Sequence, residues 1–154
     1  MSVQIVLGSK SDMKVAEGAV AVLKELGIKY RLSIASAHRT PELVDKLVAE
    51  ADAEVFIAIA GLSAALPGVI AARTTKPVVG VPVSGAVNLD SILSVVQMPP
   101  GIPVAGVGLD RGDNAALLAA EIIALKDERV RKAVLRYREK LRQNVIKDSR
   151  EVEV

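Results

Sequence analysis

The sequence has no cysteine and no tryptophan, one histidine, and only three aromatic residues among 154. Without cysteine there are no disulfides and no thiolate metal sites, and a single histidine argues against a dedicated metal centre. A module that binds a flavin or another nucleotide by stacking would find little aromatic surface here. The core must therefore consist of small aliphatic side chains, which dominate the 51% of residues that are hydrophobic.

No long uncharged apolar run is present in the sequence, and its first residues lead us to expect no secretory leader. We therefore expect a soluble, cytoplasmic protein that does not bind membranes. Residues 127–154 carry nine Lys or Arg and six Asp or Glu, so this segment is the basic part of the chain. Its charges are mixed in sign and no aromatics are interleaved, which indicates a solvated C-terminal helix and tail rather than a nucleic-acid-binding segment.

Short apolar runs alternate with helical patterns along the whole chain. The apolar runs span residues 3–7, 30–34, 55–60, 77–83 and 104–109, and the helical patterns span residues 13–26, 41–50, 69–73, 89–97, 115–125 and 128–146. This alternation with short links is typical of parallel βαβ units. We predict one α/β domain over residues 1–154: a three-layer, doubly wound, flavodoxin-like parallel sheet of about five strands in the order 2-1-3-4-5, with a C-terminal helix.

Two helical patterns carry further expectations. Residues 115–125 are apolar almost all round apart from Glu121, which is typical of a helix buried on every side. In a domain of this size we interpret that helix as a subunit interface, and we expect a closed homo-oligomer. The last helix has an apolar stripe made of Val130, Val134, Tyr137, Leu141 and Val145.

The only histidine lies in the stretch Ser36-Ala37-His38-Arg39-Thr40-Pro41. Thr40 is predicted to cap the next helix through its hydroxyl, and Pro41 suits the first helical position. His38 and Arg39 then lie at a helix N-terminus, where free N–H groups favour an anion. An imidazole that titrates near neutral pH is suited to moving a proton. A lone histidine beside a cap can also be an ordinary surface residue, so this stretch alone does not assign a role.

Three loops that follow strands are predicted to meet. In a parallel sheet of this order the ligand site lies at the carboxyl edge, where strands one and three wind in opposite directions. The loops Gly8–Asp12, Ser36–Pro41 and Gly61–Gly68 all emerge at that edge. This convergence is the main argument from the residues themselves for a functional site.

Each of these loops offers suitable chemistry. Glycine in the first loop permits close approach of a ligand to the backbone, its serines offer hydroxyls, and its aspartate either holds sugar hydroxyls or caps the first helix. The second loop completes a phosphate cradle, and the small residues of the third allow a base to lie against its backbone. The candidate substrate-binding residues are Gly8, Ser9, Ser11, Asp12, Ser36, Arg39, Gly61, Ser63 and Leu66, with His38 as the candidate catalytic residue.

One glycine-rich stretch outside these loops resembles a dinucleotide-binding fingerprint. Residues 106–112, Gly-Val-Gly-Leu-Asp-Arg-Gly, follow the fifth strand rather than the first, and their glycine spacing is wrong for that motif. We interpret the stretch as a turn.

Several short motifs occur in order along the chain: Gly8–Asp12, Ser36–Pro41, Leu66–Gly68, Gly80–Val83, Val96–Pro99 and Gly101–Pro103. Together they resemble the PurE family of purine biosynthesis. The resemblance, from about Val3 to Leu125, implies a homo-octamer, a small ribonucleotide substrate and no cofactor. It further implies a mutase reaction, in which carboxylate leaves an exocyclic nitrogen as carbon dioxide and is added to the adjacent ring carbon. In that resemblance His38 moves the proton, and Ser9, Ser11, Asp12, Ser36 and Arg39 bind the ribonucleotide.

One segment departs from the family's bacterial pattern. That pattern has Gly-Gly-Ala-Ala-His before Leu-Pro-Gly, whereas residues 61–65 here are Gly-Leu-Ser-Ala-Ala. Ser63 and Ala65 are similar to the animal-type carboxylases, which use free carbon dioxide, while Arg39-Thr40-Pro41 and Gln97 favour the mutase. Carboxylase activity is therefore the alternative to the mutase. A non-enzymatic receiver-like module would need an aspartate at the end of strand three, where the chain has Ile59-Ala60-Gly61.

Overall fold

Five parallel strands form the centre of the computed structural model, which describes residues 1–86 and 88–152. The strand order is β2-β1-β3-β4-β5 and each pair of neighbours is parallel, so the predicted doubly wound sheet is confirmed. Val87, and the last two residues of the expected C-terminal tail, lie outside the described residues. The strands are β1 (Ser2–Leu7), β2 (Lys29–Ile34), β3 (Val55–Ala60), β4 (Val78–Pro82) and β5 (Ala105–Gly106).

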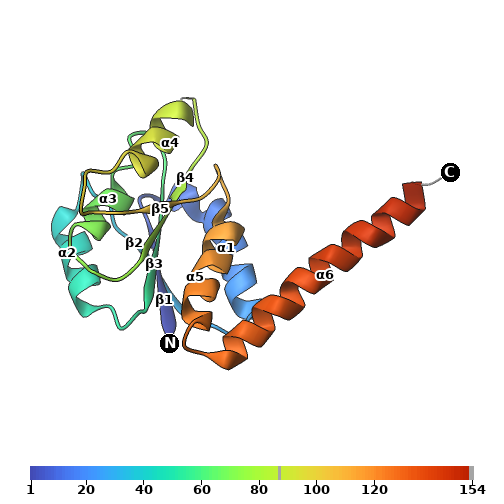
Figure 1. Ribbon diagram of the computed structural model, residues 1–154. Helices are drawn as coiled ribbons and strands as arrows, with labels where there is room; N and C mark the ends of the chain where they lie inside the picture. Colours follow the sequence, from blue (N-terminus) through green and yellow to red (C-terminus); the bar gives the residue numbers. More distant parts are fainter. Residues whose placement is uncertain (87, 153–154) are drawn as a thin grey trace.

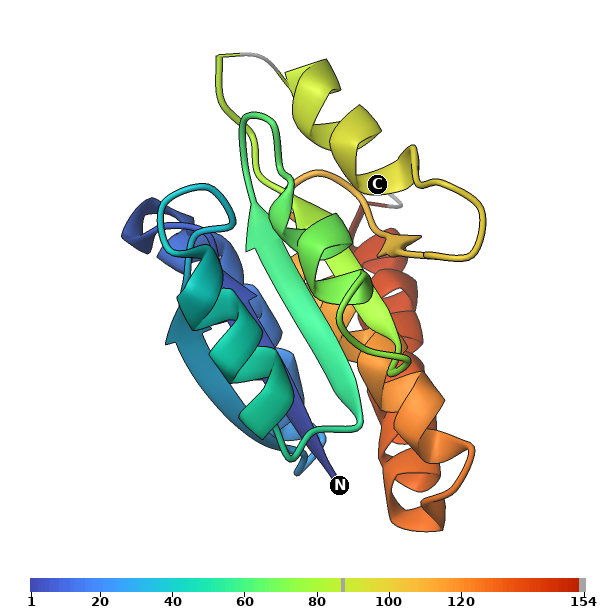
Figure 2. The same ribbon diagram turned by 90° about the vertical axis from the view of Figure 1, so that its left-hand side faces the viewer.

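Helices cover both faces of this sheet (Figures 1 and 2). One face packs against α1 and α5, whose small side chains join Ile5, Ile57 and Val79 in one core cluster. The other face, with Phe56 at its centre, packs against α2, α3 and α4. The helices are α1 (Met13–Glu25), α2 (Pro41–Glu50), α3 (Leu66–Ala71), α4 (Asn88–Val96), α5 (Gly112–Ala124) and α6 (Glu128–Val152).

The register of the central strands aligns their carboxyl ends. Leu7 of β1 lies opposite both Ile34 of β2 and Ile59 of β3, and Ile59 lies opposite Val81 of β4. The backbone N–H of Gly8 donates to the Ile59 carbonyl at 2.9 Å, and that of Ala35 donates to the Leu7 carbonyl at 2.9 Å. The loops that follow these strands therefore leave the sheet at one level, as the topology predicts.

Boundaries differ from expectation mainly at the edges of the fold. Strand β5 has two residues instead of the six expected, because Gly106 pairs only briefly with β4 before the chain turns away. Helix α3 starts at Leu66 rather than Val69, with Pro67 in its first turn. Helix α2 buries Val44 and Val48 against the sheet, while Leu43 is 38% exposed.

Helix α5 is a layer of the core, which contradicts its interpretation as a subunit interface. Ala115, Ala116, Ala119 and Ala120 are fully buried, and the helix contacts α1, α6, β3 and β4. Gly112 permits the closest approach, because a Cβ there would lie 2.2 Å from the Val15 carbonyl oxygen of α1. Small residues allow two helices to pack tightly within one chain, so an all-apolar sequence does not distinguish a core helix from an interface helix.

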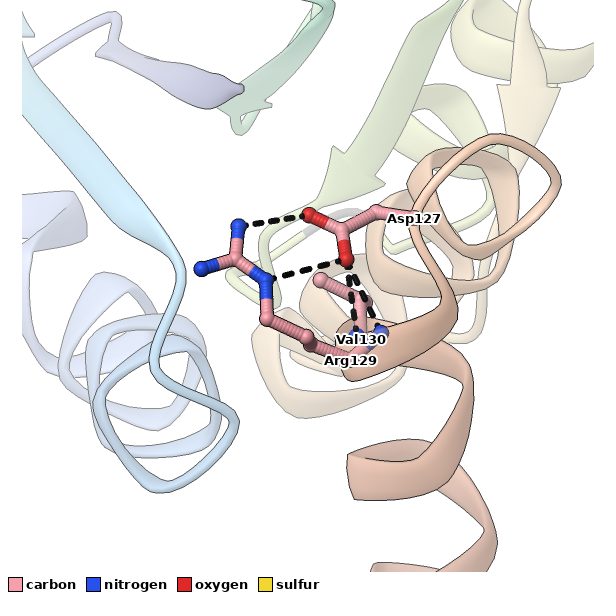
Figure 3. A network of polar contacts seen from close by, with 3 residues as sticks. All are labelled: Asp127, Arg129 and Val130. Atoms are coloured by element: carbon pink, nitrogen blue, oxygen red, sulfur yellow. Dashed lines mark hydrogen bonds and ion pairs between the residues drawn. The ribbon is translucent and has the colours of Figure 1, made fainter.

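Helix α6 begins against the body of the protein and then extends away from it (Figure 1). Asp127 accepts hydrogen bonds from the backbone N–H groups of Arg129 and Val130, and the Arg129 guanidinium contacts the same carboxylate (Figure 3). These bonds lower the pKa of Asp127, with the Arg129 side chain as the largest cause. Asp127 thus caps the helix, which continues to Val152 instead of ending near Ile146.

The apolar stripe predicted on α6 is only partly buried. Val130 and Val134 are buried against the core, whereas Leu141 and Val145 are 46% and 68% exposed. Ion pairs join the helix to its neighbours, from Arg138 to Glu121 and from Lys140 to Glu25. The distal part of the helix therefore presents apolar side chains outside the fold of one chain.

Candidate active site

A cavity of about 600 Å³ opens at the carboxyl edge of the sheet. It is lined by loops that follow β1, β2, β3 and β4, which the strand register aligns. All ten residues that the sequence nominated lie in its wall: Gly8, Ser9, Ser11, Asp12, Ser36, His38, Arg39, Gly61, Ser63 and Leu66. The predicted convergence of the loops is therefore confirmed, while the role of each residue stays a prediction.

The loop after β1 is held by a reciprocal pair of hydrogen bonds. The Ser9 hydroxyl oxygen accepts from the backbone N–H of Ser11, and the Asp12 carboxylate accepts from the backbone N–H of Ser9 at 2.9 Å. The Ser11 hydroxyl also donates to Asp12, at 3.4 Å. These bonds form a capping box on the short 3-10 turn Lys10–Asp12, which leads into α1. The Asp12 side chain makes no cap on α1 itself, so it closes the loop rather than capping the helix.

Arg39 connects the second loop to the first. Its guanidinium donates to the Gly8 carbonyl oxygen at 3.2 Å and, through Nε, to the Ser36 hydroxyl at 3.3 Å. The Ser36 hydroxyl oxygen also accepts from the Arg39 backbone N–H. Both bonds fix the position of a cation at the cavity, and other guanidinium N–H groups remain for a ligand. Ser36 and Arg39 are therefore joined in the cavity wall, and their role as a phosphate cradle stays a prediction.

Thr40 does not cap α2 through its side chain, contrary to expectation. Its hydroxyl oxygen accepts from the Ser36 backbone N–H at 3.0 Å, and its O–H donates to the Ser36 carbonyl at 3.3 Å. The threonine thus closes the turn that carries His38 instead of satisfying the first helical N–H groups. Pro41 occupies the start of α2 as predicted.

His38 lies at the tip of this turn, exposed to solvent and in the cavity wall. Because Ser36 is bonded to both Thr40 and Arg39, the backbone on either side of the imidazole is fixed. An accessible ring on a rigid turn is well suited to exchange protons with a bound ligand.

The loop after β3 has an unusual backbone. Leu62 and Ala64 both adopt positive φ angles, of 52° and 36°, in the left-handed region that side chains generally disfavour. The loop closes through a bond from the Ala64 N–H to the Gly61 carbonyl. Leu62 is 73% exposed at the mouth of the cavity, and Ser63 is also exposed. Strained non-glycine residues of this kind occur preferentially at functional sites.

One part of the wall contains none of the residues that the sequence nominated. Val83, Ser84 and Gly85, from the loop after β4, also line the cavity. Their position at the carboxyl end of a sheet strand is a signal that could have found them. The other lining residues that were not nominated are small or apolar: Ala60 ends β3, and the predicted loops contribute Ala37, Leu62, Ala64 and Ala65.

Asp12 is the acidic group of the cavity and is only 6% exposed. Burial raises the pKa of its carboxyl above the ordinary value of 3.8, although the Ser9 and Ser11 hydrogen bonds and the Arg39 charge oppose that rise. The cavity thus combines a fixed cation and hydroxyls for an anion, a buried carboxylate for hydroxyl donors, and an imidazole. Gly61–Leu66 adds a wall of mostly small side chains.

Among residues 1–86 and 88–152, no three His, Asp or Glu side chains lie together in an arrangement that would hold a metal ion. Within those residues, no helix has the length and apolar character needed to cross a membrane.

Comparison with known proteins identifies the family of the chain. A family model described as AIR carboxylase matches residues 2–144. The N5-carboxyaminoimidazole ribonucleotide mutase of Methanocaldococcus jannaschii is 60% identical over 142 residues, which cover 92% of this chain and 90% of the relative. The protein of the same name from Pyrococcus abyssi is 49% identical, with 91% of this chain and 83% of the relative covered. The crystal structure of Treponema denticola PurE superposes with a TM-score of 0.89 at 35% identity and covers 99% of this chain and 98% of that one. The chain belongs to the AIR carboxylase family.

Proposed function

We propose that this protein is an isomerase of purine biosynthesis, which moves the carboxylate of N5-carboxyaminoimidazole ribonucleotide from the exocyclic nitrogen to the ring carbon. The observation that carries the proposal is one cavity in which Arg39, Asp12 and His38 meet on aligned strand ends. The names of the relatives from M. jannaschii and P. abyssi support the same reaction.

The cavity wall suggests how the ribonucleotide is oriented. The phosphate binds Arg39 and the hydroxyls of Ser9 and Ser36, which accept bonds within the protein and keep their own hydrogens to donate. Asp12 accepts hydrogen bonds from the ribose hydroxyls, since a buried carboxylate gains from such donors. The imidazole ring of the substrate then lies against Gly61–Leu66, within reach of His38.

His38 supplies the proton movements of the reaction. A proton delivered to the exocyclic nitrogen allows the bond between that nitrogen and the carboxylate carbon to break. The nitrogen keeps the electron pair of this bond, and carbon dioxide is released. The electron-rich ring carbon then attacks carbon dioxide to form the new C–C bond. The proton on that ring carbon finally passes to His38, which restores its starting protonation state, and the reaction is an isomerisation without cofactor.

The rival function is carboxylation of aminoimidazole ribonucleotide by free carbon dioxide. The observation that favours it is the loop Gly61–Ala65, where Ala65 replaces the histidine of the family's bacterial pattern. Against it stand the mutase names of the relatives. A small-residue wall is also consistent with retention of an apolar gas near the ring carbon.

An isotope experiment separates the two reactions. Substrate labelled with ¹³C only in its carboxylate is incubated with the enzyme in unlabelled bicarbonate buffer, and the product is analysed by NMR. A mutase gives product that keeps most of the label, whereas a carboxylase gives unlabelled product after the substrate has decarboxylated. Protein with His38→Asn provides the control for spontaneous decarboxylation. Turnover only with aminoimidazole ribonucleotide and bicarbonate would overturn the proposal.

The homo-octamer implied by the family resemblance is also part of the proposal. Because α5 is buried within one chain, it does not support the octamer. The support comes from apolar side chains that one chain leaves exposed: Leu89, Leu93 and Val96 on α4, and Leu135, Leu141 and Val145 on α6. Light scattering of the purified protein would reveal a monomer if the proposal is wrong. The expected cytoplasmic location stays a prediction, which fractionation of expressing cells would test.

A further inference from the structure

The glycine-rich turn after β5 contacts the cavity wall from outside, through the side chain of Asp110. Its carboxylate accepts a hydrogen bond from the backbone N–H of Ser84 at 2.8 Å. Its own backbone N–H donates to the Pro82 carbonyl at 2.9 Å. Asp110 therefore holds the chain on both sides of Val83, where β4 ends and the cavity wall begins.

We infer that Asp110 is a positioning residue, which holds the Ser84–Gly85 segment in the wall of the cavity against the loop after β3. The inference rests on the function proposed above and extends it to a fifth loop, which does not itself line the cavity.

The backbone of Asp110 adds weight to this inference. Its φ of 59° lies in the left-handed region, which glycine adopts without strain and aspartate tolerates better than most residues. The turn contains glycines at 106, 108 and 112, yet the left-handed position has a carboxylate. A residue that served only to turn the chain would need no acceptor at this position.

Positioning by Asp110 also involves the neighbouring loop. The Val83 N–H donates to the Ala60 carbonyl at 2.9 Å, and a Cβ built on Gly61 would lie 3.3 Å from the Val83 carbonyl oxygen. The segment that Asp110 fixes is therefore packed directly against the start of the Gly61–Leu66 loop. Without the carboxylate, this part of the wall must be ordered when the ligand binds, and affinity falls because ordering costs free energy.

Three substitutions distinguish the effect of the hydrogen-bond acceptor at position 110 from the effect of the backbone conformation there. Asp110→Gly keeps the left-handed turn without strain and removes the acceptor, whereas Asp110→Asn keeps both an acceptor oxygen and tolerance of positive φ. We expect Asp110→Gly to raise KM about three- to tenfold with kcat unchanged, as for loss of one hydrogen bond that holds the ground state and the transition state equally. Asp110→Asn should restore wild-type KM. Asp113→Asn, in the first turn of α5 and bonded to Arg111, is the matched control and should leave KM unchanged.

Amide hydrogen exchange provides a readout that does not depend on activity. Exchange of the Ser84 N–H should become faster in Asp110→Gly and stay at the wild-type rate in Asp110→Asn. If the wild-type protein does not turn over the proposed substrate, the proposed function fails, while Ser84 exchange and calorimetric titration with aminoimidazole ribonucleotide still test the positioning role. Wild-type KM and wild-type Ser84 exchange in Asp110→Gly would overturn the inference. A rise in KM in Asp110→Asn as large as that in Asp110→Gly would also overturn it.

Discussion

The two walls of the cavity keep their shape by different means. The polar wall, Gly8–Asp12 with Ser36–Arg39, is held by side chains that bond to nearby backbone, including the pair between Ser9 and Asp12. In the small-residue wall, Gly61–Leu66 depends on backbone bonds and positive φ angles, whereas Val83–Gly85 is held by two side chains from outside the wall, Asp110 and Asn88. Substitutions in the polar wall should therefore affect ligand binding and chemistry, whereas those in the small-residue wall should also change backbone strain.

The largest effect is expected for the one titratable ring in the polar wall. His38→Asn should lower kcat about a hundred- to ten-thousand-fold, because asparagine forms hydrogen bonds but does not transfer the proton. Calorimetry with aminoimidazole ribonucleotide should show an affinity close to that of the wild type. A variant with near-normal turnover would remove His38 from the mechanism.

Next in size is the cation that joins the two polar loops. Arg39→Met should raise KM about ten- to a hundredfold, because charge-assisted bonds to a phosphate and the bridge to Gly8 are lost together. Arg31→Met, at an exposed position on β2, is the control for loss of one positive charge. Equal KM values for these two variants would contradict a phosphate cradle at Arg39.

A smaller effect on binding, with an opposite effect on stability, is expected at the buried carboxylate. Asp12→Asn should raise KM about tenfold, because the charged acceptor for ribose hydroxyls is lost. Since burial raises the pKa of Asp12, its ionised form costs free energy of folding at neutral pH. The stability associated with its protonated form is complete below about pH 3.8 and is lost as pH rises through the higher pKa of the folded state.

Thermal melts at several pH values test that linkage. The Tm of Asp12→Asn relative to the wild type should increase as the pH is raised from below about 3.8 to neutrality, because asparagine has no charge to desolvate. The change should occur within that interval and level off above the folded-state pKa. A relative Tm that falls with rising pH would mean that the bonds from Ser9 and Ser11 outweigh burial.

The smallest effect concerns the small-residue wall. Leu62→Gly should raise Tm by about 2–4 °C, because relief of the left-handed strain is of the order of 1 kcal/mol. Leu62→Ala is the matched control, since it shortens the side chain but keeps the strained φ. A similar rise in both variants would assign the effect to the exposed leucine side chain rather than to the backbone.

Local patterns in the sequence predicted most of the fold. Gly27 ends α1 with a φ of 69°, Pro41 starts α2, and the uniformly apolar run Val55–Ala60 is the fully buried central strand. The strand order was predicted from the alternation of strands and helices. Because that order places the ends of the strands at one edge of the sheet, it also predicted that the nominated loops converge. Each of these features depends on a few neighbouring residues or on chain topology, and both can be read without coordinates.

The failures concern choices between equivalent partners. The hydroxyl of Thr40 was able to bond either to a backbone N–H of α2 or to the Ser36 backbone. In the structure it bonds to Ser36. From the sequence, the apolar helix α5 was able to pack either against a partner chain or against a helix of its own chain. In the structure it packs against α1, and Gly112 permits the close approach. A single sequence lists the donors, acceptors and apolar faces, but it does not rank competing partners.

The sequence by itself therefore determined the strand and helix types, the order of the sheet and which loops meet at its carboxyl edge, because periodicity, caps and right-handed crossovers are local or topological properties. Only the tertiary structure decided that Asp12 closes its own loop, that Arg39 bonds to the Gly8 carbonyl, and that Asp110 holds Ser84. The contacts of Arg39 and Asp110 join segments far apart in the chain, and Asp110 also adopts a positive φ angle. Their geometry is settled only when the layers pack at van der Waals distance.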